Sequence, residues 1–180
     1  MKQFAVPTKE SVSSENVVHF DALQKALGMV PNLYATIAYS DTGLSRYLAF
    51  QNAKTSLTNK EKEAVNLVVS EVNGCLYCQS AHTVLGKMTG FSEQEILNLR
   101  SGSSGNPKLQ ALVLLAKDIT KNKGRASATS LNAFYNAGYN NANLVDLILQ
   151  ISGKIAMNYP HNLTKIPVDF PLAQPLNVPV

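Results

Sequence analysis

The stretch EAVNLVVSEVNGCLYCQSAH, residues 63–82, holds both cysteines of the 180-residue chain and one of its three histidines. In its first half, Ala64 and Val65 begin an apolar helix face, and Asn73 and Gly74 then form a typical helix stop. The second half starts a new helix, with Cys75 expected in its first turn. We therefore predict two consecutive helices with the cysteine pair at their junction.

The rest of the chain shows the same helical pattern, and no alternation typical of strands persists. Thr58 with Glu61, and Ser92 with Glu95, fit capping boxes, in which each residue satisfies the free backbone N–H of the other. Pro107 suits the first turn of a helix. Other helices are predicted within residues 14–30, 31–43, 43–54, 92–100, 107–124, 127–138 and 141–159. The prediction is an all-α helical bundle that forms one domain over residues 1–180.

Two segments are predicted to lie outside the helices. The sequence SGSSGN, residues 101–106, is a loop and a candidate boundary between an N-terminal and a C-terminal helical half. The proline-rich end, residues 160–180 approximately, cannot continue a helix. We expect it to lie extended over the body of the protein or over a neighbouring subunit.

Composition and charge exclude several classes of function. Hydrophobic residues make up 45% and charged residues 16%, which suits a folded core. The net charge is +4, but the lysines are scattered, so we expect no nucleic-acid partner. Because the chain shows neither a signal peptide nor a run of about eighteen apolar residues, we expect no membrane span and a cytoplasmic location. In that reducing compartment, a close cysteine pair is more often catalytic or metal-binding than a structural disulfide.

The spacing of the motif suits thiol chemistry. Cys75, Cys78 and His82 stand at positions i, i+3 and i+7, so a helix would bring them to one face. Free amide groups and the positive end of the helix dipole favour a thiolate, and an adjacent imidazole can accept a thiol proton. The dipole favours Cys75 as the attacking thiol, whereas the imidazole favours Cys78. We give the imidazole more weight, because proton transfer needs hydrogen-bond reach.

The acidic partner of the histidine stays open at this level. Glu71 is close in sequence but lies at a helix end, where we expect exposure to solvent. Glu63 lies near the apolar face of its helix and would reach His82 only if the two helices fold back on each other. Spacing alone does not choose between the two glutamates.

Two alternatives to a redox pair need weighing. A zinc site needs about four ligands; Cys75, Cys78 and His82 supply three, and only His19 or His161 remains to complete the set. The second alternative is a pair of inert buried cysteines beside a capping histidine. A thioredoxin-like site is rejected, because no strand pattern precedes the first cysteine.

The quoted stretch resembles the core of the alkylhydroperoxidase AhpD-like, carboxymuconolactone decarboxylase superfamily. Glu63, Cys75, Cys78 and His82 fall on the family pattern without a gap. The sequence NYPHNLTKIPVDFPLA, residues 158–173, is similar to the tail of a peroxidase-related branch. The resemblance implies an AhpD-like all-α fold, a homo-oligomer (dimer, trimer or hexamer) and thiol peroxidase activity.

The resemblance also implies a role for each motif residue. Cys78 would attack the hydroperoxide and become a sulfenic acid, and Cys75 would resolve it into a disulfide. His82 would accept the proton of Cys78, and Glu63 would polarise the imidazole. An external dithiol such as a lipoyl group would restore the thiols, with no metal or cofactor bound to the chain. Some relatives carry a second histidine where this chain has Tyr77, whose reference pKa near 10 makes it a poor base.

Three functions therefore compete. The leading one is a thiol-dependent alkyl hydroperoxide reductase, or a general dithiol–disulfide oxidoreductase, with an antioxidant role. The second is a lactone decarboxylase of the same superfamily, which the presence of both cysteines disfavours. The third is a non-enzymatic helical oligomer with a metal or redox-sensing site.

Overall fold

The computed structural model describes residues 4–176, and within this range the chain forms α-helices, one short 3₁₀ helix and no strand. The helices are η1 (Lys9–Ser11), α1 (Ser14–Leu27), α2 (Asn32–Ile37), α3 (Gly43–Gln51), α4 (Asn59–Val72), α5 (Leu76–Met88), α6 (Glu93–Ser101), α7 (Pro107–Lys121), α8 (Ala128–Asn136) and α9 (Asn141–Thr164). The predicted all-α class is confirmed. In this part of the chain, none of the helices is long and apolar enough to cross a membrane.

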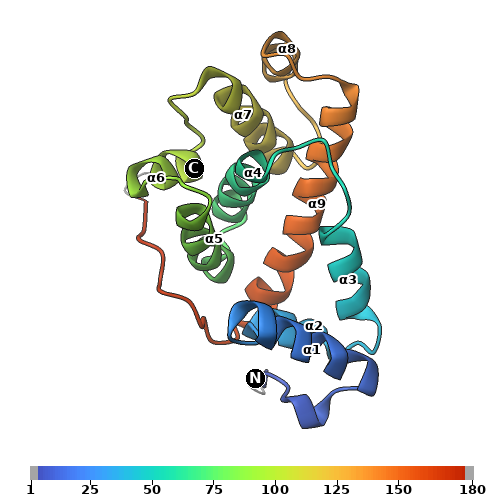
Figure 1. The fold of residues 1–180 in the computed structure, drawn as a ribbon. Helices are drawn as coiled ribbons and strands as arrows, with labels where there is room; N and C mark the ends of the chain where they lie inside the picture. Colours follow the sequence, from blue (N-terminus) through green and yellow to red (C-terminus); the bar gives the residue numbers. More distant parts are fainter. Residues whose placement is uncertain (1–3, 177–180) are drawn as a thin grey trace.

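Helix α4 is the central element of the fold, because it packs against α5, α6, α7 and α9. Figure 1 shows α4 and α5 beside the long α9, with α1, α2 and α3 gathered at one end of the molecule and α8 at the other. The two helices of the quoted stretch, α4 and α5, thus lie between the two ends.

Local capping chemistry explains where several helices begin. The backbone N–H of Thr58 donates to the Glu61 carboxylate at 2.8 Å, and the N–H of Glu61 donates to the Thr58 hydroxyl at 3.2 Å. Ser92 and Glu95 repeat this exchange at the start of α6. Pro107 occupies the first turn of α7. Both predicted capping boxes and the predicted proline start are confirmed.

The main hydrophobic core joins helices from both sides of the 101–106 loop. Its buried members are Leu57, Ala64, Val65, Leu67, Val68, Val69, Phe91, Ile96, Leu99, Leu112, Val113, Leu115, Ala116, Ile119, Phe134, Tyr139, Leu147 and Ile151. The loop itself is held by Gln110, whose side chain accepts from the N–H of Ser104 at 2.5 Å and donates to the carbonyl of Gly102 at 3.2 Å. The loop is therefore a tight connection inside one packed core, and it does not divide the helices into two halves.

The C-terminal segment follows the body of the protein after α9. The helix passes through Pro160 and ends at Thr164, so the extended part begins at residue 165 rather than near 160. Asp169 accepts from the N–H of Asn32 at 2.7 Å, and the N–H of Ala173 donates to the Ser80 hydroxyl at 3.1 Å. The segment runs from the base of α9 past α5 towards α6 (Figure 1). The last four residues of the predicted tail, 177–180, lie outside the described residues.

Candidate active site

The cysteine pair lies where α4 turns into α5. Gly74 has a φ of +59°, a left-handed conformation that glycine adopts without a side-chain clash. Cys75 is the N-cap of α5, and its Sγ accepts from the backbone N–H of Cys78 at 3.4 Å. The sequence placed Cys75 inside the first turn, whereas the helix begins at Leu76, because the sulfur itself serves as the capping acceptor.

The two thiols are free, buried and electrostatically different. Cys75 is 0% exposed and Cys78 is 2% exposed. A hydrogen bond from the Cys75 thiol lowers the pKa of Cys78; burial opposes this effect, and the charges of Lys154 and His82 add to it. The same hydrogen bond, together with burial, raises the pKa of Cys75. This asymmetry makes Cys78 the more nucleophilic sulfur near neutral pH.

Helix α4 brings Glu63 to the histidine. The carboxylate is buried and hydrogen-bonded to Nδ1 of His82, which is also buried. Asn66 donates to the second carboxylate oxygen at 3.2 Å, and Gln150 holds the Asn66 carbonyl at 2.7 Å. Burial raises the pKa of Glu63, but the charge and hydrogen bond of His82, with Lys154 and Asn66, lower it below its usual value overall. Of the two candidate glutamates, Glu63 is the one that reaches the imidazole.

Glu71 has a different position from the one expected. Its side chain is only 13% exposed, and both its contacts with Arg100, from Nε and from Nη2, measure 2.8 Å. Arg100 comes from α6 and is itself 1% exposed. The expectation of solvent exposure at this helix end was wrong, because α6 packs over the end of α4.

Lys154 is the residue of this site that the sequence analysis missed. It lies on α9, is 8% exposed, and its ammonium is hydrogen-bonded to Nε2 of His82. It shares the buried side of α9 with Leu147, Ile151 and Asn158. A lysine on the buried stripe of a mostly apolar helix was the available signal. No pattern in the sequence indicated that its partner lies on α5.

Both ring nitrogens of His82 are therefore engaged. Because a carboxylate only accepts and an ammonium only donates, an imidazole with its proton on Nδ1 satisfies Glu63 and Lys154 together. Among the described residues, no hydrogen bond joins His82 directly to Cys78. The expected direct transfer of a proton from Cys78 to His82 thus lacks the contact it would need in this conformation.

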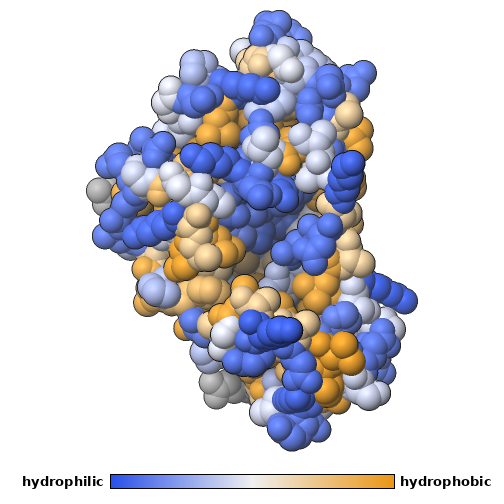
Figure 2. Space-filling view, viewed as in Figure 1, coloured by the Kyte–Doolittle hydropathy of each residue, from blue (hydrophilic) through white to orange (hydrophobic). Residues whose placement is uncertain are grey.

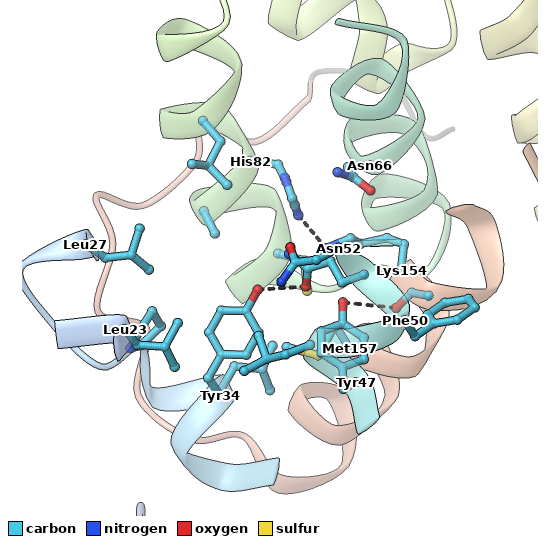
Figure 3. A pocket seen from close by; sticks show the side chains of 18 of the residues that line it. Leu23, Leu27, Tyr34, Tyr47, Phe50, Asn52, Asn66, His82, Lys154 and Met157 are labelled. Atoms are coloured by element: carbon cyan, nitrogen blue, oxygen red, sulfur yellow. Dashed lines mark hydrogen bonds between the residues drawn. The ribbon is translucent and has the colours of Figure 1, made fainter. Parts of the chain in front are cut away.

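A cavity of about 840 Å³ opens beside these groups, and its wall includes Cys78, His82 and Lys154. Figure 3 shows Tyr34, Tyr47, Phe50 and Met157 around this space, together with Leu23 and Leu27 of α1. Figure 2 shows a recess near the middle of the same face of the molecule, with hydrophobic residues beside it. The volume is that of a small-molecule pocket, with a largely apolar wall and a few polar groups.

Two tyrosines in the pocket wall are fixed by hydrogen bonds. The Tyr34 hydroxyl donates to Gln51 at 2.8 Å, and the Tyr47 hydroxyl donates to the carbonyl of Gly153 at 3.4 Å. Burial raises the pKa of both phenols, so they stay protonated at neutral pH. They are therefore rigid, neutral parts of the wall.

Two groups weighed as possible additions to the motif, Tyr77 and His161, pack against each other. Tyr77 is buried; its hydroxyl accepts from the N–H of Leu33 at 3.2 Å, and its ring meets Phe170 edge-on. His161 packs against the same tyrosine, with ring centroids 5.4 Å apart. Over residues 4–176, no group of three or more His, Cys, Asp or Glu side chains is arranged to hold a metal ion. Tyr77 and His161 thus have packing roles, and Tyr77 also lines the pocket.

Fold and site together define an all-α protein with a buried Cys-x-x-Cys pair at a helix start, next to a carboxylate–imidazole–ammonium chain. Residues 42–118 match the model of the carboxymuconolactone decarboxylase family. No curated protein sequence gives a significant match to the chain.

Solved structures share the whole fold. A peroxidase-related protein from Silicibacter sp. TM1040 is 20% identical, with a TM-score of 0.80 over 93% of this chain and 94% of that one. A peroxidase-related protein with an alkylhydroperoxidase AhpD core, from Ralstonia eutropha JMP134, is 18% identical, with a TM-score of 0.83 over 93% and 92%. The debrominase Bmp8, in complex with 2,3,4-tribromopyrrole, is 14% identical, with a TM-score of 0.77 over 94% and 93%. The predicted resemblance to the AhpD-like, carboxymuconolactone decarboxylase superfamily is confirmed.

Proposed function

We propose that the protein is a thiol-dependent hydroperoxide reductase that works as a dithiol–disulfide oxidoreductase. The observation that carries this proposal is the contact between two buried thiols with opposite pKa shifts, at the wall of a small-molecule pocket. A thiolate beside a protonated thiol is the arrangement that a two-step peroxidase needs, since one sulfur attacks and the other resolves.

The reaction divides into three balanced steps. The Cys78 thiolate attacks one oxygen of the hydroperoxide, the O–O bond breaks, and a proton converts the leaving alkoxide into an alcohol. The Cys75 thiol then attacks the Cys78 sulfenic acid, forming a disulfide and releasing water. An external dithiol such as a lipoyl group exchanges with this disulfide and restores both thiols as it is oxidised.

The protein supplies position and electrostatics to this chemistry. Glu63 and His82 form a buried pair that fixes the imidazole against Lys154 at the wall of the pocket. The positive charge near Cys78 favours its thiolate. The apolar wall limits water around the sulfenic acid until Cys75 reacts.

The test is hydroperoxide consumption with a dithiol donor, followed in two single variants. Cys78→Ser should abolish consumption, because no attacking sulfur remains. Cys75→Ser should consume one equivalent and stop at a sulfenic acid, which a dione reagent such as dimedone traps. Full turnover in Cys78→Ser would contradict the assignment.

A second candidate is reductive dehalogenation of an aromatic halide, favoured by the aromatic wall that Tyr34, Tyr47 and Phe50 form. In this reaction the halogen passes to the Cys78 sulfur, the ring carbon takes a proton, and Cys75 displaces halide to form the disulfide. Bromide release from a bromopyrrole, measured beside hydroperoxide consumption in the same preparation, decides between the two substrates.

The two remaining alternatives have distinct signatures. A lactone decarboxylase needs no thiol pair, so turnover of a carboxylated lactone by Cys75→Ser/Cys78→Ser would favour it. Stoichiometric zinc that depends on both cysteines would favour a metal-sensing oligomer. We further propose that the protein is a cytoplasmic homo-oligomer in which each chain folds as a single domain.

A further inference from the structure

Lys154 places a buried ammonium in the wall of the pocket that Cys78 also lines. Over the described residues, its one hydrogen-bond partner is Nε2 of His82. An ammonium has three N–H donors, so two of them have no protein acceptor. An unused donor in an apolar pocket is positioned to bind an acceptor on the substrate, because leaving it unpaired costs free energy.

The ammonium is held in one orientation by the groups behind it. Figure 3 shows the hydrogen bond that Lys154 donates to His82, and His82 is in turn fixed by Glu63 of α4. The pocket wall contains other titratable groups: Tyr34 of α2, Tyr47 of α3, Cys78 and Tyr77 of α5, Asp146 of α9, and Lys54 and Asp169 outside the helices. Burial raises the pKa of the three tyrosines, so they stay protonated at neutral pH. Asp146 and Asp169 accept hydrogen bonds from Ser56 and Asn32, and Lys154 is the one of the described lysines that is hydrogen-bonded to His82.

Thiol peroxidation needs two proton movements at one place. The attacking thiol must lose its proton, and the alkoxide that leaves when the O–O bond breaks must gain one. The imidazole is shielded from both tasks, because Glu63 and Lys154 occupy its two nitrogens. His82 and Lys154 both line the pocket, and of the two the lysine has donors that no described residue accepts from.

We propose that Lys154 is the proton carrier of this site and that His82 and Glu63 position it. This inference rests on the proposed hydroperoxide reaction. The cycle starts from the Cys78 thiolate and the Lys154 ammonium, which binds the hydroperoxide and gives its proton to the leaving alkoxide. The resulting amine takes the proton of the Cys78 thiol once the external dithiol has restored it, and the thiolate and ammonium form again. Thiol and hydroperoxide become sulfenic acid and alcohol, and the lysine returns to its starting state.

Two reagents separate the parts of this role. Iodoacetamide reports the Cys78 thiolate alone, because iodide leaves without a proton. Cumene hydroperoxide needs both the thiolate and a proton donor. We measure both second-order rates against pH in a Cys75→Ser background, where Cys78 is the one remaining cysteine.

Three variants complete the design. Lys154→Met should move the pH dependence of alkylation to higher pH, because the charge that favours the thiolate is lost. At a pH where the thiolate has formed, the alkylation rate should match that of the parent. The hydroperoxide rate should stay about 100-fold below that of the parent, the lower end for a lost acid–base catalyst. Lys154→Arg keeps the charge but not the transferable proton, because a guanidinium stays protonated at every working pH. It should therefore alkylate like the parent and react with hydroperoxide at least about 10-fold more slowly. Lys87→Met, an exposed lysine on α5, should change neither rate.

Each outcome bears on the assignment. A Lys154→Arg protein that matches its parent with both reagents overturns it, as does a Lys154→Met protein that loses both rates equally at every pH. Thermal unfolding of each variant ensures that the rates compare folded proteins. A parent that is alkylated but never reacts with hydroperoxide contradicts the proposed function itself, and the lysine role with it.

Discussion

At the scale of single residues, Cys75 has two separate tasks in the same geometry. Its sulfur caps the start of α5 by accepting from the backbone of Cys78, and its thiol hydrogen stabilises the Cys78 thiolate. Both tasks follow from the three-residue spacing, which brings the N-cap side chain back to the first turn. The resolving cysteine therefore also activates the attacking one.

This arrangement predicts that Cys75→Ala raises the pKa of Cys78. A thiol with a lowered pKa reacts down to a lower pH, and protonation removes its reactivity as the pH falls through that pKa. Without the hydrogen bond from Cys75, the half-point of iodoacetamide alkylation should move up towards the ordinary thiol value of about 8.5. Cys75→Ser keeps a hydroxyl donor and is the matched control, with a smaller shift expected. Equal profiles for alanine and serine would exclude the hydrogen bond as the cause.

Glu63 makes an acid-sensitive contribution to stability. Its pKa is lowered in the folded protein, so the unfolded chain binds the proton first as the pH falls. The stabilisation is fully present above the ordinary value of 4.5 and is lost as the pH falls through the lower folded value. Glu63→Gln should therefore lose less unfolding free energy between pH 6 and pH 3 than the parent, as urea titrations would measure. An identical acid loss in both proteins would contradict this role.

Local spacing was enough to predict Cys75, Cys78 and His82 as one group, because they stand at positions i, i+3 and i+7. The choice of Glu63 over Glu71 came from the resemblance to the family pattern. Local spacing was not enough for Lys154, which approaches His82 from 72 positions away. That contact depends on how α9 packs against α5, and helical periodicity says which side of a helix is buried but not which neighbour covers it. The same limit explains why Glu71 was wrongly predicted to be exposed to solvent.

At the scale of helices, starts were predictable and ends less so. A capping box needs only two residues three positions apart, so the starts of α4 and α6 could be predicted from the sequence. The end of α9 depends on contacts beyond its own sequence. Pro160 removes one backbone donor, and the helix continues for another turn.

The turn between α4 and α5 gives a prediction at this scale. Gly74 is left-handed, and a Cβ placed on it would meet nothing within 4 Å. Gly74→Ala should therefore cost only the conformational strain of a left-handed alanine, about 1–2 kcal/mol of unfolding free energy. Gly105→Ala is the matched control, since that glycine is equally open and is not left-handed. Urea unfolding of the two variants measures the difference, and equal stabilities would contradict the strain argument.

At the scale of the whole molecule, the C-terminal segment connects elements that are distant in sequence. Phe170 packs on Tyr77 of α5, and Asp169 accepts from the N–H of Asn32 at the start of α2. The proline content predicted an extended segment, but its path over α5 could not be read from the chain. Two hydrogen bonds fix the segment there: one from the N–H of Ala173 to Ser80, and one from Arg100 to the carbonyl of Gln174.

Arg100 connects three parts of the chain: α6, the end of α4 and the C-terminal segment. It lies on α6, pairs with Glu71 at the end of α4, and donates to the carbonyl of Gln174 at 2.7 Å. Arg100→Met leaves the Glu71 carboxylate almost buried and unpaired, so it should cost about 3–5 kcal/mol of unfolding free energy. Because the same change releases Gln174, the C-terminal segment should also become more sensitive to limited proteolysis.

A double variant separates the two effects of Arg100. Arg100→Met/Glu71→Gln removes the stranded charge, so most of the unfolding free energy should return, because an apolar replacement of a buried pair is often neutral. Its C-terminal segment should stay protease-sensitive, because the bond to Gln174 is still missing. Full protection of the segment in the double variant would mean that Phe170 and Asp169 hold it without Arg100. If Arg100→Met alone loses less than about 1 kcal/mol of unfolding free energy, the ion pair contributes no more than a typical surface pair.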